Sequence, residues 1–221
     1  MSEQEAAVVT EREAGPALPA HCREASGVPA RGDARCAWLV SKGFEPGNWM
    51  LALAPLLGWH ADGATGAGWG LLAALFTSML PSAMLGWGER RGYWSDRHVR
   101  QRQERLVAGP VVLSSVITGT GLLYGLDATP DVCALVAAML TVLLALMAVT
   151  FFWKVSVHCA VAAGALTVLA SVFGPVAGLA APLVALIGWS RVRLRCHTVA
   201  QVAVGACVGA SVGAATFDLL R

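Results

Sequence analysis

The chain has 221 residues, of which 56% are hydrophobic and 14% are charged, and its formal net charge is +2. An ordinary soluble domain has roughly 25% charged residues, so this composition and a mean hydropathy of +0.61 exclude that class and require apolar surface that faces lipid. The length suits one helical bundle rather than two domains, and we expect no nucleic-acid partner.

The N-terminal segment, residues 1–47, mixes charged residues with Ala, Gly and Pro. It contains no apolar run long enough for the core of a signal peptide, and it shows no sustained helical periodicity. We therefore predict a polar tail that is disordered or loosely helical.

From Asn48 to the C-terminus, apolar runs alternate with short polar breaks. Several runs approach the length of about 20 residues that a helix needs to cross a bilayer. Residues 48–221 are therefore predicted to form an all-α, polytopic transmembrane bundle of six to seven spans. The predicted spans are 48–61, 66–88, 107–126, 131–153, 157–173, 176–189 and 197–217.

Two features predict how these helices turn and pack. Gly174 and Pro175 separate two short apolar runs; because proline removes a backbone donor and glycine permits a turn, we expect a hairpin of two short helices, with one long kinked helix as the alternative. Runs of small residues at 162–165 and 205–215 would let helix backbones approach closely.

The polar breaks differ in charge. Three of them hold basic residues, whereas the alternate breaks at 62–65 and 127–130 hold none. The positive-inside rule then places the three basic breaks and the N-terminus in the cytoplasm, with the bundle in the plasma (inner) membrane. Arginines that are retained to bind phosphate would produce the same uneven distribution of positive charge between the breaks. The basic residues are Arg90, Arg91, Arg97, Arg100, Arg102, Arg105, Lys154, Arg191, Arg193 and Arg195.

The six cysteines have no C-x-x-C pair or regular spacing, which predicts free thiols. Cys159 and Cys196 each adjoin a histidine, but neighbouring residues on a helix point about 100° apart. No clustered carboxylates are available either. We therefore expect no metal site and no cofactor.

The basic breaks also hold the residues expected to carry chemistry. His98 and Arg105 lie in the first, Ser156 and His158 in the second, and Ser190, Arg191 and His197 in the third. The planar donor fork of arginine fits phosphate oxygens, and histidine can act as a nucleophile or as a general acid near neutral pH. This combination predicts a site for phosphoryl transfer without a metal.

The spacing resembles that of the type 2 phosphatidic acid phosphatase and vanadium haloperoxidase superfamily. Residues 190–197 reproduce the S-R-x5-H core of its third motif. Residues 154–158, K-V-S-V-H, resemble the second motif, P-S-G-H, and keep its serine and histidine. His98, followed after six residues by Arg105, resembles the first motif, K-x6-R-P, with Leu106 in the proline position. The order is that of the family, and the resemblance covers residues 95–217.

The resemblance implies a role for each residue. His197 would attack phosphorus to form a phosphohistidine, and His158 would protonate the leaving oxygen. The phosphate oxygens would be bound by Arg105, Arg191, Ser156 and His98. The family has an aspartate four residues after the nucleophilic histidine, and here Gln201 stands in that position. A glutamine oxygen can orient the imidazole but supplies no negative charge.

The leading hypothesis is therefore an integral-membrane phosphatase that hydrolyses a lipid phosphate or a prenyl (di)phosphate, with the bilayer and its lipids as partners. A second is an enzyme that binds a prenyl diphosphate and ionises, cyclises or transfers the prenyl group. A third is a catalytically inactive protein that binds lipid phosphate. A small transporter or channel is disfavoured, because the predicted spans carry almost no ionisable residues at mid-depth.

Overall fold

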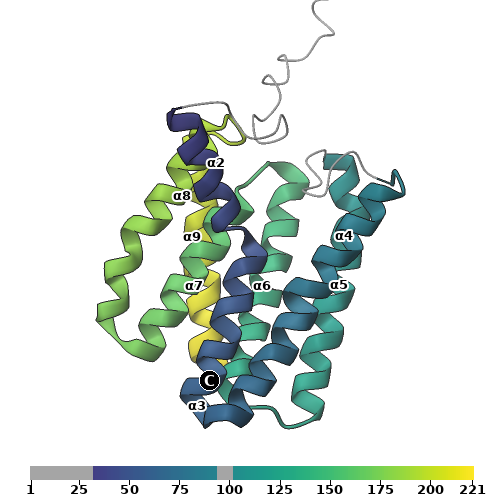
Figure 1. Ribbon diagram of the computed structural model, residues 1–221, viewed down its shortest axis with the longest axis vertical. Helices are drawn as coiled ribbons and strands as arrows, with labels where there is room; N and C mark the ends of the chain where they lie inside the picture. Colours follow the sequence, from purple (N-terminus) through teal and green to yellow (C-terminus); the bar gives the residue numbers. More distant parts are fainter. Residues whose placement is uncertain (1–31, 94–101) are drawn as a thin grey trace, which may run out of the picture.

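A computed structural model of the protein describes residues 32–93 and 102–221, except for the side chains of residues 102–107. The described part contains helices and no strand, which confirms the predicted all-α class. The elements are α2 (Asp33–Gly43), α3 (Pro46–Ala74), the π-helix η1 (Leu75–Met79), α4 (Leu80–Arg90), α5 (Arg102–Gly125), α6 (Pro130–Phe152), α7 (Val157–Phe173), the 3₁₀-helix η2 (Pro175–Ala180), α8 (Ala181–Arg193) and α9 (Val199–Leu220). Figure 1 shows the long helices side by side along the long axis.

The helices confirm a membrane protein with transmembrane helices. In the described residues, five helical stretches are long and apolar enough to cross a bilayer, and α7 is a shorter apolar helix. This gives five to six spans where the sequence predicted six to seven. The difference lies in the continuous 45-residue stretch Pro46–Arg90, which contains two of the predicted spans.

This stretch turns back on itself within α3. Asp62 and Gly63 leave the helical conformation, and Gly63 has a φ of 53°. Gly58 and Gly66, on either side of the turn, lie so close that a Cβ on one would overlap the backbone of the other. Farther from the turn, Ser78 Oγ donates to Gly47 O at 2.9 Å. The two arms are therefore antiparallel, as Figure 1 also shows.

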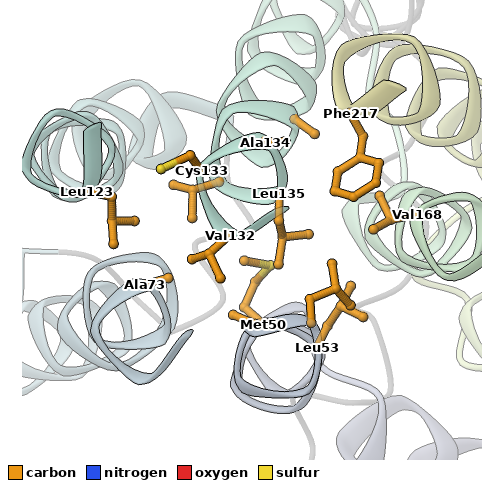
Figure 2. Packing of buried hydrophobic residues seen from close by; sticks show 14 of the residues in the cluster. Met50, Leu53, Ala73, Leu123, Val132, Cys133, Ala134, Leu135, Val168 and Phe217 are labelled. Carbon is orange, nitrogen blue, oxygen red and sulfur yellow. The ribbon is translucent and has the colours of Figure 1, made fainter. Parts of the chain in front are cut away.

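The centre of the bundle is α6. Half of its most apolar window is buried, against 22% to 33% for the other four long stretches. Figure 2 shows side chains of α3, α5, α7 and α9 converging on those of α6, with Leu53, Val168 and Phe217 on the side of Leu135 and Leu123 on the side of Val132 and Cys133. Because lipid is as apolar as these side chains, close packing rather than transfer from water holds such helices together.

The closest helix pair is α7 with α9, and glycine permits it. Gly205, Gly209 and Gly213 recur every fourth residue on α9, so they share one face. A Cβ at Gly205 would lie 2.5 Å from Ser156 O, and one at Gly209 would overlap the backbone of Ala160. This confirms the close approach predicted from the small residues. It also brings the first turns of α7 and α9, which follow the second and third motifs, side by side.

The turn at Gly174 confirms the predicted hairpin. Gly174 has a φ of 79°, a left-handed conformation that glycine adopts without strain. Pro175 then begins η2, and α8 returns along α7.

Residues 33–43, which belong to the segment predicted as a tail, form α2 and pack on α8. Ala37 is buried in a cluster with Leu194 and Cys196. An isolated helix of 11 residues is marginal, so these tertiary contacts stabilise α2.

Candidate functional site

The second and third motifs meet at one end of the bundle. Lys154 Nζ donates to Cys196 O at 2.9 Å. Nε2 of His197, the residue after Cys196, lies 3.2 Å from the carbonyl oxygen of Val155, the residue after Lys154. Two side chains therefore join the loop before α7 to the loop before α9, and they place His197 beside the residues that precede His158.

Ser156 begins α7 as its N-cap residue. Its hydroxyl accepts from Cys159 N at 3.5 Å, and its own N–H donates to Gln201 O at 3.2 Å. The side chain is completely buried. Ser156 therefore holds the N-terminal end of α7 against α9, where the helix dipole favours an anion.

A Schellman motif ends α8 and sets the position of His197. Arg195 takes a left-handed φ of 57°, and its N–H donates to Val192 O at 2.9 Å. The N–H groups of Cys196 and His197 donate to Arg191 O at 3.0 and 3.3 Å. These bonds satisfy the last carbonyls of α8 and fold the chain back, so that Arg191 and His197 lie within one turn.

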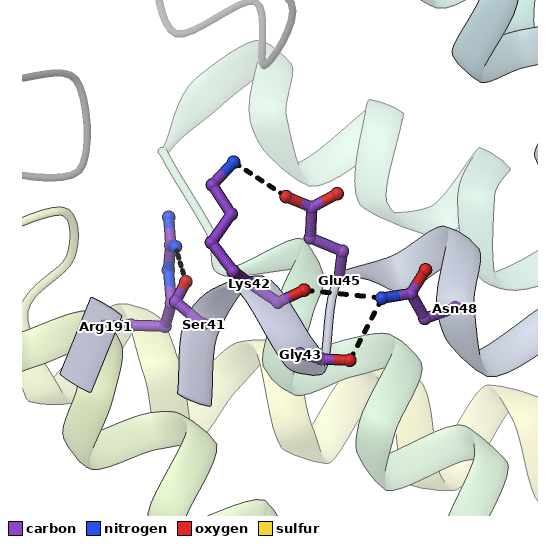
Figure 3. A network of polar contacts seen from close by, with 6 residues as sticks. All are labelled: Ser41, Lys42, Gly43, Glu45, Asn48 and Arg191. Atoms are coloured by element: carbon purple, nitrogen blue, oxygen red, sulfur yellow. Dashed lines mark hydrogen bonds and ion pairs between the residues drawn. The ribbon is translucent and has the colours of Figure 1, made fainter. Parts of the chain in front are cut away.

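Arg191 and His158 are the buried charged or titratable groups of the site. Arg191 is 6% exposed and His158 is 7% exposed. Arg191 lies in the last turn of α8, where the helix dipole favours a cation. Its Nη1 donates to Ser41 Oγ of α2 at 2.5 Å, as Figure 3 shows. The sequence contained no signal for Ser41, because 150 residues separate the two partners.

Gln201 takes part in a capping box. Its Oε1 accepts from Thr198 N at 3.1 Å, and its N–H donates to Thr198 Oγ1 at 3.3 Å. The predicted role of Gln201 in orienting His197 stays a prediction. The acceptor that the structure places at the imidazole is Val155 O, which sequence motifs cannot reveal because it belongs to the backbone.

Two predicted phosphate ligands are not placed in full. His98 lies outside the described residues. Arg105 belongs to the first turn of α5, and its side chain is among those not described. The structure adds Lys154 to the cationic groups of the site. Its ammonium donates a hydrogen bond to Cys196 O in the loop that holds the third motif.

A cavity of about 1330 Å³ reaches this cluster. Lys154, His158, Arg191 and His197 line it at the end where the two motifs meet. Most of the remaining lining is apolar, but Glu45, Arg90 and several neutral polar residues also line it, namely Asn48, Thr77, Ser78, Ser82 and Thr150. Its walls include Leu135 and Phe152 of α6; at 1.5 Å per residue these lie roughly 25 Å apart along the helix. The lining also includes Met50, Leu53, Met139, Leu143, Val161 and Val168.

The cysteines differ from the prediction at one position. Cys196 is disulfide-bonded, so the prediction of six free thiols is wrong there. Free thiols in the described residues are Cys36, Cys133, Cys159 and Cys207.

Comparisons of the chain with protein-family models, with curated proteins and with solved structures gave no match. The chemistry of the site therefore rests on the residues, contacts and cavity described above.

Proposed function

We propose that the protein is an integral-membrane phosphatase that hydrolyses a lipid phosphate or a prenyl (di)phosphate through a phosphohistidine. The observation that carries the proposal is the cavity, with Lys154, His158, Arg191 and His197 at one end and a mostly apolar lining along the rest. Cationic and imidazole groups suit a phosphate, whereas the apolar walls suit a hydrocarbon chain. A water-soluble phosphate ester would leave most of this cavity without a complementary group.

In the proposed reaction, a ring nitrogen of His197 attacks phosphorus while the bond from phosphorus to the leaving oxygen breaks. Val155 O accepts a hydrogen bond from Nε2, which selects the tautomer with its lone pair on the other ring nitrogen. His158 donates a proton to the leaving oxygen. Water then attacks the phosphohistidine and gives its proton to His158, which restores both groups.

The cations act on charge that develops in the transition state. Arg191 is nearly excluded from solvent, so its interaction with phosphate oxygens is weakly screened. Lys154 supplies a second positive charge on the same loops.

The test is turnover by purified protein given a panel of lipid phosphates and prenyl diphosphates, with phosphate, diphosphate and hydrocarbon products scored separately. His197→Ala should abolish phosphate release, since the proposed reaction passes through a bond between phosphorus and this imidazole. His158→Ala should slow substrates with poor leaving groups most. Full phosphate release by His197→Ala would contradict the assignment.

His60 provides a matched control. Its ring contacts that of Phe173 in a tilted arrangement, with ring centroids 4.8 Å apart, and it does not line the cavity. His60→Ala should keep wild-type turnover. An equal loss in His60→Ala and His197→Ala would show that the effect of either variant comes from instability.

Gln201 supports a second candidate function. Its side chain is neutral, so it supplies no negative charge to the His197 imidazole, and it already caps the N-terminal end of α9. In this case the site binds a prenyl diphosphate and ionises, cyclises or transfers the prenyl group. The panel would then yield diphosphate with a modified hydrocarbon, and His197→Ala would weaken binding yet retain some product. An inactive lipid-phosphate binder would yield no product at all.

For the orientation, we propose that the site and the N-terminus face the cytoplasm across a plasma membrane. The support is the basic character of the breaks at one end of the bundle, against the absence of Lys and Arg from 62–65 and 127–130. The disulfide of Cys196 is the observation that favours the opposite side, because disulfides persist in oxidising compartments. Labelling of introduced cysteines decides between the two.

A further inference from the structure

The helix α2 lies outside residues 95–217, which carry the family resemblance, yet it contacts the centre of the site. Ser41 is completely buried, and its hydroxyl accepts from Nη1 of Arg191 at 2.5 Å. Figure 3 shows this bond between two helices that are far apart in the sequence. A residue of α2 thus holds a side chain expected to bind phosphate.

The nature of the partner matters for phosphate binding. A hydroxyl is neutral, so it can fix the guanidinium plane without cancelling the positive charge of Arg191. Arg193, two residues farther along α8, shows the contrast: its Nε donates to the Asp33 carboxylate at 2.6 Å. A carboxylate neutralises its arginine and competes with phosphate for the same donors. The two arginines are therefore held by α2 in different ways, and only Arg191 lines the cavity.

Ser41 is itself firmly placed. On the N-terminal side, Ala37 packs with Leu194, and Asp33 pairs with Arg193. On the C-terminal side, Asn48 Nδ2 donates to Lys42 O and Gly43 O at 3.3 and 3.0 Å, which ties the end of α2 to α3. A fixed acceptor removes rotational freedom from the long arginine side chain before a ligand binds.

We propose that Ser41 is a positioning residue for phosphate recognition, so that α2 is part of the site rather than a peripheral helix. The Ser41 hydroxyl orients Arg191, and Arg191 contacts the phosphate oxygens. This inference rests on the proposed function, because it assumes that Arg191 binds phosphate.

The test compares Ser41→Thr with Ser41→Val. The two replacements have nearly the same shape and add bulk at the same buried position, but only threonine retains the hydroxyl. The measurements are the affinity for inorganic phosphate, from the shift in Tm with phosphate concentration, and the KM for phosphate release from the active substrate of the panel. Ser41→Val should bind phosphate about tenfold more weakly than Ser41→Thr, which corresponds to about 1.4 kcal/mol.

Two further variants separate positioning from stability. Asp33→Asn removes the neighbouring ion pair of α2 and should leave phosphate affinity unchanged. In an Arg191→Ala background, exchanging threonine for valine at position 41 should have no effect on phosphate affinity, because the group that Ser41 orients is gone.

Equal phosphate affinity in Ser41→Thr and Ser41→Val, with binding lost in Arg191→Ala, would overturn the role of Ser41 and leave the proposed function in place. A difference between the pair in Tm without phosphate, but none in phosphate affinity, would assign Ser41 a purely structural role and overturn the proposal. A wild-type protein that phosphate does not stabilise, and that releases no phosphate, would overturn the proposed function and this inference together.

Discussion

Removing the Arg191 side chain tests the site most directly. Arg191 is 6% exposed, so water cannot readily take the place of its guanidinium beside a phosphate. Loss of one preorganised donor from such a site typically costs about 3 kcal/mol, or roughly a hundredfold in kcat. We expect Arg191→Ala to lose about this much. Arg191→Lys should show an intermediate loss, because lysine keeps the charge but not the planar fork.

Arg193→Ala is the matched control for Arg191→Ala. Arg193 lies on the same helix, its side chain is 42% exposed, and it pairs with Asp33. Exposed ion pairs contribute about 0–1 kcal/mol to stability, so turnover should stay within about twofold of wild type. The assay is phosphate release by protein in lipid vesicles, with kcat and KM determined separately. Equal losses for both arginines would refute the reasoning. A rise in KM with kcat unchanged would show that Arg191 binds the substrate and the transition state equally well, which contradicts only the predicted loss in kcat.

Three further predictions concern helix packing, the role of residue 201 in orienting the His197 imidazole, and the orientation of the protein in the membrane. Gly209→Ala should destabilise the protein by about 1–3 kcal/mol, because the added Cβ on α9 would overlap the backbone of α7. Gly121→Ala has open space around it and should stabilise the protein by about 0.5–1 kcal/mol. Thermal unfolding in detergent measures both changes. Gln201→Asp should raise or maintain the rate of a phosphatase and impair a prenyl-diphosphate transformation, and steady-state turnover distinguishes these outcomes. A single cysteine at Gly92, without the native thiols, should be protected from impermeant reagent in intact cells while one at Ala64 is labelled, and the reverse pattern would place the site outside.

Much of the architecture follows from local properties of the chain, which sequence reasoning can read. The length of an apolar run decides whether a helix can cross a bilayer, and Gly174 with Pro175 decides where a hairpin turns. The spacing of Arg191 and His197 is also local, because a helix end and its Schellman turn bring these residues together. The all-α class, the hairpin and the proximity of Arg191 to His197 were therefore predictable.

The span count was less predictable, because one continuous apolar stretch can run straight or turn back. The sequence from Pro46 to Arg90 suggested two spans. In the structure this stretch counts as one long apolar segment, but its helix is interrupted at Asp62 and Gly63, where the chain turns back. Likewise, residues 33–43 show no sustained periodicity, and only the surface offered by α8 stabilises them as a helix. Both outcomes depend on packing partners that local patterns do not specify.

By itself, the sequence determined the membrane class, the small-residue faces and the order of the motifs, since each depends on residues that are neighbours in the chain. Only the tertiary structure decided which distant groups meet. It brought Val155 O to His197 and Ser41 to Arg191, and it formed a mostly apolar cavity beside them. These contacts require α7 and α9 to approach each other at Gly205 and Gly209, and they require α2 to pack on α8. The physical reason is that such helix pairings depend on complementary surfaces whose residues are far apart in the sequence.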